Sequence, residues 1–318
     1  MTSIFTKIAH LLTRKINFAL GLSSFMLAIA AGFLTAPAHA ADFRITLEIN
    51  ETHRTAIIYE PRRLKRVPRA TLIVLHGTEN GARIRRRLGL DALVANAGYA
   101  TVYPDALNGQ WNNGLEGAPG RPDDNAYLRA LIAKLVSAGL SDPRRIYIIG
   151  SSDGGLMALR FACESSNLIA GTVTLLASLP VSLAESCKLT KPIPYLSIAG
   201  TVDPLVPFTG GPVAIKGRKG DVISVDKTVE LFASAGGCIG PRSVRQLQDK
   251  DKDDNSTANL ETYAGCKVPV NLIRIEGGGH AFPGRRTAIM GPSGSVGPVN
   301  RDIESNKVIW DFVRSLPR

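Results

Sequence analysis

The sequence predicts a doubly wound, mostly parallel α/β sheet of eight strands with helices on both faces. Three observations predict this fold class. Short apolar runs alternate with amphipathic stretches along the chain, most of the apolar runs are continuous, and several amphipathic stretches begin at Asp and end at Gly. Continuous apolarity is typical of strands that are covered on both faces. Strands alternating with helices indicate right-handed crossovers between parallel strands.

The expected elements follow one another without an internal repeat or an interdomain linker. Residues 43–49 and 55–61 alternate apolar with polar side chains across a short turn, which predicts an antiparallel pair. The other expected strands are residues 71–77, 99–105, 145–151, 171–178, 194–201 and 270–278. Helical spacing occurs over residues 86–98, 123–139, 154–165, 225–237 and 302–316. Residues 247–262 are polar enough to predict a mobile excursion.

Residues 1–40 have the pattern of a secretory signal peptide. A basic start precedes an apolar stretch, and residues 38–40 form an Ala-x-Ala cleavage site. The alternative is an uncleaved membrane anchor, because the apolar run approaches the length that spans a bilayer. Pro37 and the cleavage site favour processing. We therefore expect a single domain over residues 41–318 that is secreted or periplasmic and has no stable membrane association.

The charge balance is basic but scattered. The formal net charge of +11 becomes +8 once the three cations of residues 1–40 are removed. Only residues 61–69 and 83–87 concentrate cations, and no nucleic-acid motif accompanies them. This pattern favours a solvated surface over nucleic-acid binding, with a general attraction to anionic polymers as the lesser alternative. We expect no nucleic-acid partner and no cofactor.

The cysteines indicate disulfides. An even number in an exported chain is typical of disulfide bonding, and the lack of a Cys-x-x-Cys pair argues against a metal site. Three pairings are open, of which the nearest-neighbour pairing closes the two shortest loops. The cysteines are Cys163, Cys187, Cys238 and Cys266.

A glycine-rich corner joins the expected strand 145–151 to the expected helix 154–165. Its residues, Gly150-Ser151-Ser152-Asp153-Gly154, fit the pattern G-x-S-x-G only when Ser152 is the central serine. In that pattern a nucleophile lies on a strained strand-to-helix turn, and small neighbours let the chain pass close by. The alternative is a merely structural glycine turn. The position of the corner is the one that the pattern requires, so we predict that Ser152 is a nucleophile.

A serine nucleophile needs a base, which is usually a histidine. Two of the five histidines lie within residues 1–40, and His53 lies in an early strand or turn. His76 ends the third expected strand, where an imidazole more often braces a loop. His280 follows the last expected strand, on a loop whose three glycines let it reach the edge where Ser152 emerges. We predict His280 as the base and rank His76 second.

The third member of the site should be a carboxylate that orients the imidazole. Asp203 lies just beyond the strand 194–201 and comes between the other two residues in the chain. Asp221 and Asp226 are rivals, but they open a helix and are more simply explained as capping or first-turn charges. The resulting order, Ser152, Asp203, His280, is that of the α/β-hydrolases.

The predicted chemistry also needs N–H donors for a tetrahedral oxyanion. One should be the backbone N–H of Asp153, and the other should come from the loop after the third strand, most plausibly the N–H of Thr78. The alternative for Thr78 is a loop residue without a role.

With these residues in place, the chain resembles the secreted α/β-hydrolases of the poly(3-hydroxybutyrate) depolymerase-like group, which adjoin the feruloyl and acetyl xylan esterases. The resemblance covers nearly all of residues 41–318. It rests on "LIVLHG", "GLDALVANAGYATVYPDA", "WNNG", "DDNAYLRALIAKL", "DPRRIYIIGSSDGGLMALRFACE", "GTVDPLVPFTGG" and "YAGC…RIEGGGHAFPG". It implies an α/β-hydrolase fold, the same Ser-Asp-His triad, and bonds that join Cys163 to Cys187 and Cys238 to Cys266.

The resemblance also implies a function. It favours a secreted serine carboxylic-ester hydrolase acting on 3-hydroxybutyrate-type oligomers or polymer, with a feruloyl or acetyl xylan esterase as the alternative. Since no polymer-binding module is visible, soluble oligomers are expected over a crystalline surface. A non-catalytic binding protein on the same scaffold is a lower alternative. A peptidase is ranked lower as well, because neither a propeller nor a long cap is visible.

Two positions near the predicted site depart from the family pattern. Asp153 stands where relatives usually have Asn, and Phe282 stands where they usually have Trp. A carboxylate at position 153 should stabilise an imidazolium. Asp153→Asn is therefore expected to shift the acidic limb of the pH–rate profile to lower pH. Phe282 retains a ring for substrate contact but offers no indole N–H.

Trp111 follows the fourth expected strand and therefore lies on the predicted active-site edge. We expect it, together with Phe282, to bind substrate, as a wall for an acyl chain or an aromatic group. The alternative for Trp111 is a side chain packed beneath a loop.

Overall fold

The computed structural model describes residues 41–61, 68–117, 122–215, 217–284 and 296–317. The predicted signal peptide, residues 1–40, lies outside the described residues. The described residues belong to one compact unit. Within the described part of the chain, no helix has the length and apolarity needed to span a bilayer.

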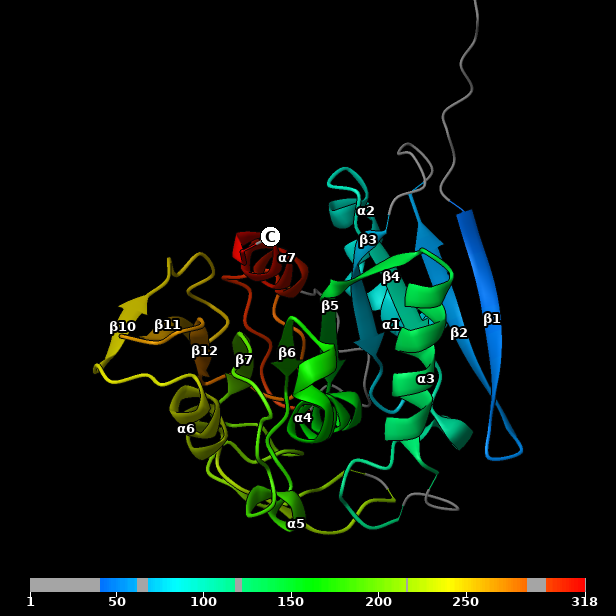
Figure 1. The fold of residues 1–318 in the computed structure, drawn as a ribbon. Helices are drawn as coiled ribbons and strands as arrows, with labels where there is room; N and C mark the ends of the chain where they lie inside the picture. The colour runs from blue at the N-terminus through cyan, green and yellow to red at the C-terminus, as the bar shows by residue number, and fades with distance from the viewer. Residues whose placement is uncertain (1–40, 62–67, 118–121, 216, 285–295, 318) are drawn as a thin grey trace, which may run out of the picture. The chain divides into compact units, whose positions relative to one another are not determined.

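The centre of the fold is a sheet with the strand order β1-β2-β4-β3-β5-β6-β7-β12-β11-β10 (Figure 1). All eight expected strands are present in it. The first pair is antiparallel as predicted, and the strands from β4 to β12 in this order are parallel. The strands are β1 (Ala41–Ile49), β2 (Thr52–Glu60), β3 (Arg69–Leu75), β4 (Ala100–Pro104), β5 (Ser141–Ser151), β6 (Gly171–Leu175), β7 (Tyr195–Gly200), β10 (Arg242–Gln246), β11 (Thr257–Tyr263) and β12 (Val270–Glu276).

The central strands bury both faces, which explains their continuous apolarity. In β3, Ile73 and Leu75 join the core on one face, and Leu72 and Val74 join the core on the other. Successive side chains of a strand point to opposite faces, so such a strand can carry no polar stripe. All the residues of β3, β4, β6 and β7 are buried.

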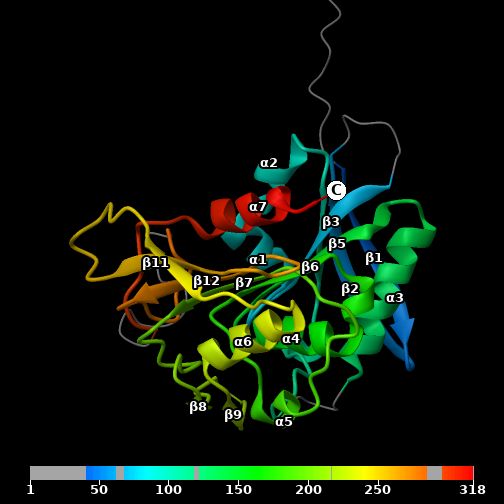
Figure 2. The same ribbon diagram turned by 60° about the vertical axis from the view of Figure 1, so that its left-hand side comes forward.

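Helices cover both faces, as the sequence predicts. Residues of α3, α4 and α6 belong to one core cluster, and residues of α1, α2 and α7 belong to the other. Figure 2 shows the two groups on opposite sides of the sheet. The helices are α1 (Gly81–Leu88), α2 (Leu90–Ala95), α3 (Asp124–Ser137), α4 (Asp153–Ser165), α5 (Val181–Ala184), α6 (Val225–Ala235) and α7 (Ser305–Ser315).

The single helix expected over residues 86–98 is wrong. The chain forms two helices there, and the first begins five residues earlier, where the Asn80 side chain accepts the Arg83 N–H at 3.0 Å. Gly89 separates the two helices with φ 62°, a left-handed conformation that glycine adopts without a steric penalty. The apolar pattern continues across this break, which is why periodicity alone did not reveal it.

The mobile excursion expected over residues 247–262 is also partly wrong. Its last six residues, 257–262, lie in β11, which pairs antiparallel with β12 and with β10 and so extends the sheet beyond the eight expected strands. Strand β10 is exposed along its whole length, and polar residues dominate both added strands. Strands of this kind, at the edge of the sheet or next to it, lack the continuous apolar run that predicts the central strands.

The carboxyl ends of the parallel strands lie at one edge of the sheet. Loops after β3, β4, β5, β7 and β12 therefore meet there, and they carry the residues considered below. A further segment at this edge contains a small antiparallel ribbon of β8 (Gly211–Pro212) and β9 (Asp221–Val222), visible in Figure 2.

Candidate active site

Ser152 occupies a strained turn between β5 and α4. Its backbone has φ 52° and ψ −124°, a conformation that residues with a Cβ rarely adopt. The Ser152 N–H donates to the carbonyl oxygen of Leu175 at 2.9 Å, which ties the turn to the neighbouring strand β6. The side chain is thereby presented at the carboxyl end of the sheet.

The glycines of the G-x-S-x-G corner are required by close packing. A Cβ on Gly150 would lie 2.2 Å from the carbonyl oxygen of Gly154. A Cβ on Gly154 would lie 2.3 Å from the carbonyl oxygen of His76. Any side chain at either position would therefore displace the backbone around Ser152.

Ser152, His280 and Asp203 lie in one hydrogen-bonded line. The distance from Ser152 Oγ to His280 Nε2 is 2.8 Å, and the distance from His280 Nδ1 to Asp203 Oδ2 is 2.7 Å. All three side chains are buried. The three residues that the sequence singled out are thus brought together, although they come from the ends of three different strands.

The Asp203 carboxylate is oriented by its own loop. Its Oδ1 accepts the backbone N–H groups of Leu205 and Val206 at 2.8 and 2.9 Å, which leaves Oδ2 directed at His280. An aspartate that bonds the backbone just beyond itself forms a tight local turn. The short turn after β7 therefore fixes which oxygen meets the imidazole.

The two rival carboxylates lie elsewhere. Asp221 is exposed in β9. Asp226 accepts Arg242 at 2.8 Å and Arg274 at 2.6 Å, and these two hydrogen bonds lower the pKa of its carboxyl group against the opposing effect of burial, which is the largest single influence. Asp226 therefore belongs to a partly exposed ion-pair cluster.

The loop that carries His280 is held by backbone contacts to a later segment. The N–H of Gly279 donates to the carbonyl oxygen of Pro298 at 2.8 Å, and the N–H of His280 donates to that of Val296 at 2.5 Å. A Cβ on Gly279 would lie 2.3 Å from the same Val296 oxygen. The glycines before His280 thus allow two chain segments to pass in contact.

His76 braces a loop and lies apart from the triad. Its Nε2 accepts the Ala106 N–H at 2.9 Å, so its Nδ1 carries the proton and donates to the Gly77 carbonyl oxygen at 2.8 Å. Burial lowers the pKa of His76 from its ordinary value of 6.5. A buried imidazole with both nitrogens occupied by the backbone is a structural group.

The segments predicted to supply oxyanion donors lie beside Ser152. A Cβ on Gly77 would lie 3.2 Å from the Cβ of Ser152, so the loop that leads to Thr78 passes against the serine. Asp153 is the first residue of α4, and N–H groups in the first turn of a helix have no acceptor within the helix. The loop after β3 and the start of α4 therefore both border Ser152.

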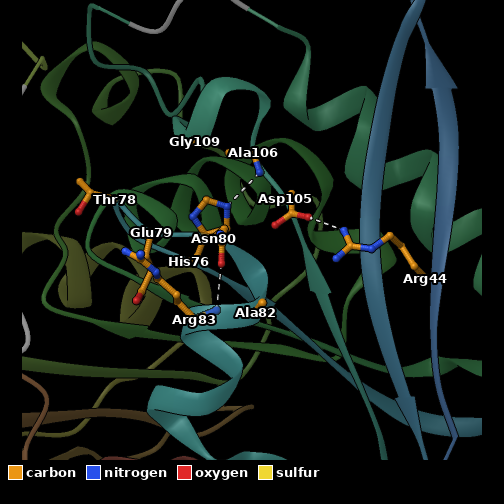
Figure 3. Close-up of a pocket in the computed structure, with 10 residues that line it drawn as sticks. All are labelled: Arg44, His76, Thr78, Glu79, Asn80, Ala82, Arg83, Asp105, Ala106 and Gly109. Atoms are coloured by element: carbon orange, nitrogen blue, oxygen red, sulfur yellow. Dashed lines mark hydrogen bonds and ion pairs between the residues drawn. The ribbon is translucent and has the colours of Figure 1, made fainter.

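A hollow of about 530 Å³ opens at the ends of β3 and β4 (Figure 3). In the sheet, these strands lie on one side of β5, and the strands that precede Asp203 and His280 lie on the other. Asp105 in the hollow is paired with Arg44 at 3.2 Å. The lining residues are Arg44, His76, Thr78, Glu79, Asn80, Ala82, Arg83, Asp105, Ala106 and Gly109.

Trp111 does not line an open site, so its expected substrate contact is not met. The side chain is fully buried, its Nε1–H donates to the carbonyl oxygen of His76 at 2.9 Å, and its ring packs against the His76 ring at 5.1 Å between centroids. This is the alternative of a tryptophan packed beneath a loop. The indole N–H is hydrogen-bonded to the backbone and is therefore not available to a ligand.

Phe282 is likewise buried, and the substrate contact expected of its ring stays a prediction. Its ring lies under the guanidinium of Arg87, 4.2 Å from the centroid, and Arg87 pairs with Glu79 at 3.0 Å. The ring therefore packs between the loop after β12 and the helix α1. It joins the apolar core on that face of the sheet.

Asp153 is paired with a cation that the sequence did not single out. Arg218 Nη2 lies 2.8 Å from Asp153 Oδ2, Arg218 Nε lies 2.9 Å from Oδ1, and each side chain is 1% exposed. The expectation that the Asp153 charge stabilises the His280 imidazolium loses its basis, because the guanidinium neutralises that charge. A buried carboxylate requires such a partner, but nothing in the sequence tells which of the 38 Lys and Arg residues it is.

Both expected disulfides are present. One joins Cys163 on α4 to Cys187, and the other joins Cys238 to Cys266. The first ties the helix that follows Ser152 to the segment after α5. The described residues contain no cluster of His, Cys, Asp or Glu suited to a metal ion.

A mostly parallel sheet with helices on both faces, and a serine, an aspartate and a histidine at its carboxyl edge in that chain order, define the α/β-hydrolase class. Comparison with known proteins supports this classification. Residues 112–231 match the family model described as Phospholipase/Carboxylesterase.

Relatives extend the match over most of the chain. NocK of Nocardia uniformis subsp. tsuyamanensis, provisionally named an esterase, is 35% identical over 77% of this chain and 74% of its own length. Feruloyl esterase B of Piromyces equi is 28% identical over 58% of this chain, a match that spans 34% of that protein. The chain therefore belongs to the α/β-hydrolase esterases.

A solved structure supports the same fold. The acetyl xylan esterase from Aspergillus awamori superposes with a TM-score of 0.54 at 14% identity, covering 75% of this chain and 94% of that one. At this identity the likeness concerns the fold alone.

Proposed function

We propose that this protein is a serine carboxylic-ester hydrolase in which Ser152 is the nucleophile, His280 the general base and Asp203 the residue that orients the imidazole. The observation that carries the proposal is the continuous line of short hydrogen bonds from Ser152 Oγ through His280 to Asp203. The strained backbone of Ser152 supports it further, since such strain is typical of nucleophiles displayed on strand-to-helix turns.

In the proposed reaction, His280 Nε2 accepts the hydroxyl proton as Ser152 Oγ attacks the carbonyl carbon of the ester. The protonated imidazole then gives this proton to the leaving alkoxide, and the acyl group stays on Ser152. A water that His280 deprotonates attacks the acyl carbon, and the carboxylic acid leaves as the proton returns to Oγ. Asp203 keeps Nδ1 protonated throughout, so that Nε2 always faces the serine.

The negative charge of each tetrahedral intermediate needs fixed donors. We assign these to the backbone N–H groups of Asp153 and Thr78. The contact of Gly77 with Ser152 and the position of Asp153 at the start of α4 support this assignment. Preorganised backbone donors of this kind are worth about 10²-fold to 10³-fold in kcat each.

Two classes of ester are candidates for the substrate. The motifs around the site resemble those of poly(3-hydroxybutyrate) depolymerase-like proteins, which favours 3-hydroxybutyrate oligomers or polymer. The names of several relatives favour feruloyl or acetyl esters of plant polysaccharides instead.

We further propose that residues 1–40 are a signal peptide and that residues 41–318 form the secreted or periplasmic catalytic domain. The two disulfides support an oxidising location for that domain. Mass spectrometry of the protein exported by an expressing cell tests this point. A mature chain that begins at Ala41 is expected, and an intact residue 1–40 segment would contradict it.

A hydrolysis panel tests the catalytic proposal. Initial rates are measured on short p-nitrophenyl esters, 3-hydroxybutyrate oligomers, methyl ferulate and acetylated xylan, with Ser152→Ala as the matched control. Turnover that is lost in the control is expected, and equal rates for the two proteins on every ester would contradict a Ser152 mechanism. The substrate with the highest kcat/KM decides between the two ester classes.

A further inference from the structure

The Asp153 carboxylate, adjacent to the proposed nucleophile, lies at the centre of a buried network. Besides its ion pair with Arg218, its Oδ2 accepts the backbone N–H of Trp111 at 3.0 Å and its Oδ1 accepts the Asn113 side-chain amide at 2.8 Å. We call Asp153, Arg218, Trp111, Asn113 and His76 the Asp153 network. All five side chains are buried.

Arg218 holds the same loop from its other side. Its Nη2 donates to the carbonyl oxygen of Trp111 as well as to Asp153. Arg218 lies between β8 and β9, far along the chain from both partners, and this segment also pairs with the loop after β4 through Glu116 and Lys219. One guanidinium therefore joins three chain segments: the nucleophile turn, the loop after β4 and the β8–β9 segment.

Trp111 extends the network to the loop after β3. Its Nε1–H donates to the carbonyl oxygen of His76, two residues before Thr78. The network thus reaches both segments to which we assign the oxyanion donors. Asp153 supplies one donor from its own backbone, and the loop that leads to Thr78 is fixed through Trp111 and His76.

We propose that Arg218 is a positioning residue for the esterase reaction, and this inference rests on the proposed function. Arg218 touches neither Ser152 nor His280 in the contacts of the described residues. It acts by neutralising the Asp153 carboxylate and by fixing the Trp111 backbone, which together set the positions of the two oxyanion N–H groups. Hydrogen-bond donors stabilise a developing charge only when they are held in the right place before the reaction.

The chain contains a matched pair that separates positioning from simple stability. Arg54 and Asp124 form a second buried ion pair, with Nη2 and Oδ1 2.5 Å apart and side chains 2% and 0% exposed. Asp124 also accepts a backbone N–H of the same loop, that of Asn112 at 2.6 Å. This pair resembles Arg218–Asp153 in burial and charge, but none of its described contacts reaches the nucleophile turn.

The test compares Arg218→Gln with Arg54→Gln in the mature protein. The kcat and KM for p-nitrophenyl acetate are measured together with the affinity for a trifluoromethyl ketone, which forms a tetrahedral adduct with a nucleophilic serine. For Arg218→Gln we expect kcat to fall on the order of 10²-fold and the affinity for the ketone to fall in parallel, with KM changed by less than about threefold. For Arg54→Gln we expect reduced stability in urea but a kcat within about threefold of the parent protein.

Two results would overturn the proposal. One is an Arg218→Gln protein that keeps the parent kcat and ketone affinity, and the other is an equal loss of both in Arg54→Gln. If Arg218→Gln does not fold, Arg218→Lys is tested in its place. Lysine keeps the positive charge but lacks the planar set of N–H donors of the guanidinium. We expect an intermediate loss of kcat for it, and an unchanged kcat would also overturn the proposal. Failure of the proposed function would look different, since the parent protein itself would then hydrolyse no ester.

Discussion

The two sides of Ser152 are built in different ways. On the side of β7 and β12, Asp203 and His280 form a single line of hydrogen bonds with Ser152. Two loops carry them, and the loop of His280 is held by backbone hydrogen bonds to Val296 and Pro298. On the side of β3 and β4, the backbone is fixed by interlocking contacts among residues from four chain segments. Proton transfer needs a few aligned side chains, whereas a backbone N–H can be aimed only by fixing the chain around it.

The largest effect is expected on the side of the hydrogen-bonded line. Asp203→Asn should lower kcat by about 10⁴-fold, because an amide in place of the carboxylate favours the tautomer with the proton on Nε2. Steady-state kinetics on a p-nitrophenyl ester measure this loss. Asp226→Asn is the matched control, since that carboxylate lies in a partly exposed ion-pair cluster and should leave kcat within about threefold. A loss below about tenfold for Asp203→Asn would contradict the proposed role.

A smaller effect with a distinct signature is expected on the other side. Asp153→Asn should lower kcat by roughly 10-fold to 100-fold, because it leaves Arg218 buried without its anion and disturbs the nucleophile turn. The acidic limb of the kcat/KM profile should stay within about 0.3 pH unit, since the charge removed is already neutralised by Arg218. A shift of this acidic limb to lower pH by about one pH unit would mean that the carboxylate acts directly on His280, as the sequence alone suggests.

The smallest effect concerns stability rather than catalysis. Because burial lowers the pKa of His76 below 6.5, the unfolded chain takes up a proton first as the pH falls. The free energy of unfolding should therefore fall as the pH drops from about 6.5 to the lowered pKa of His76 in the folded state. The slope should be at most about 1.4 kcal/mol per pH unit. His76→Gln, whose side-chain oxygen can still accept the Ala106 N–H, should show a shallower slope.

Urea denaturation between about pH 7.5 and 5.5 measures this slope. His53→Gln is the control, because it replaces an exposed histidine that lies outside the His76 brace. A slope for His76→Gln equal to that of the parent protein would mean that His76 is not held neutral, and the brace between β3 and β4 would need another explanation.

The contrast between the two sides also explains what could be predicted from the sequence. Ser152, Asp203 and His280 each follow an apolar strand, and their chain order is a recognisable pattern. These three residues could therefore be predicted from the sequence alone. Six of the eight expected strands were predicted for the same reason, since burial on both faces leaves a continuous apolar run, and the first two were predicted from their alternation of apolar and polar residues. Gly89 escaped prediction because the apolar pattern continues across the helix break, and β11 escaped it because polar residues interrupt any apolar run there.

The partners of Asp153 could not be predicted in the same way. That a carboxylate beside the nucleophile would need a cation when buried follows from its desolvation cost, but Arg218 lies 65 residues further on, in a segment without a motif. Trp111 was ambiguous for a related reason. Its position after a strand fits either a side chain that contacts substrate or one that packs beneath a loop. The hydrogen bond from its indole N–H to the His76 carbonyl oxygen favours the second.

The central claim is that Ser152 is an activated nucleophile, and covalent labelling tests it most directly. The mature protein is treated with a fluorophosphonate probe and analysed by intact-protein and peptide mass spectrometry, in parallel with Ser152→Ala. We predict one adduct, on the peptide that contains Ser152, which is absent from the variant and slowed by Asp203→Asn. No labelling of the folded parent protein, or labelling that persists in Ser152→Ala, would contradict the account.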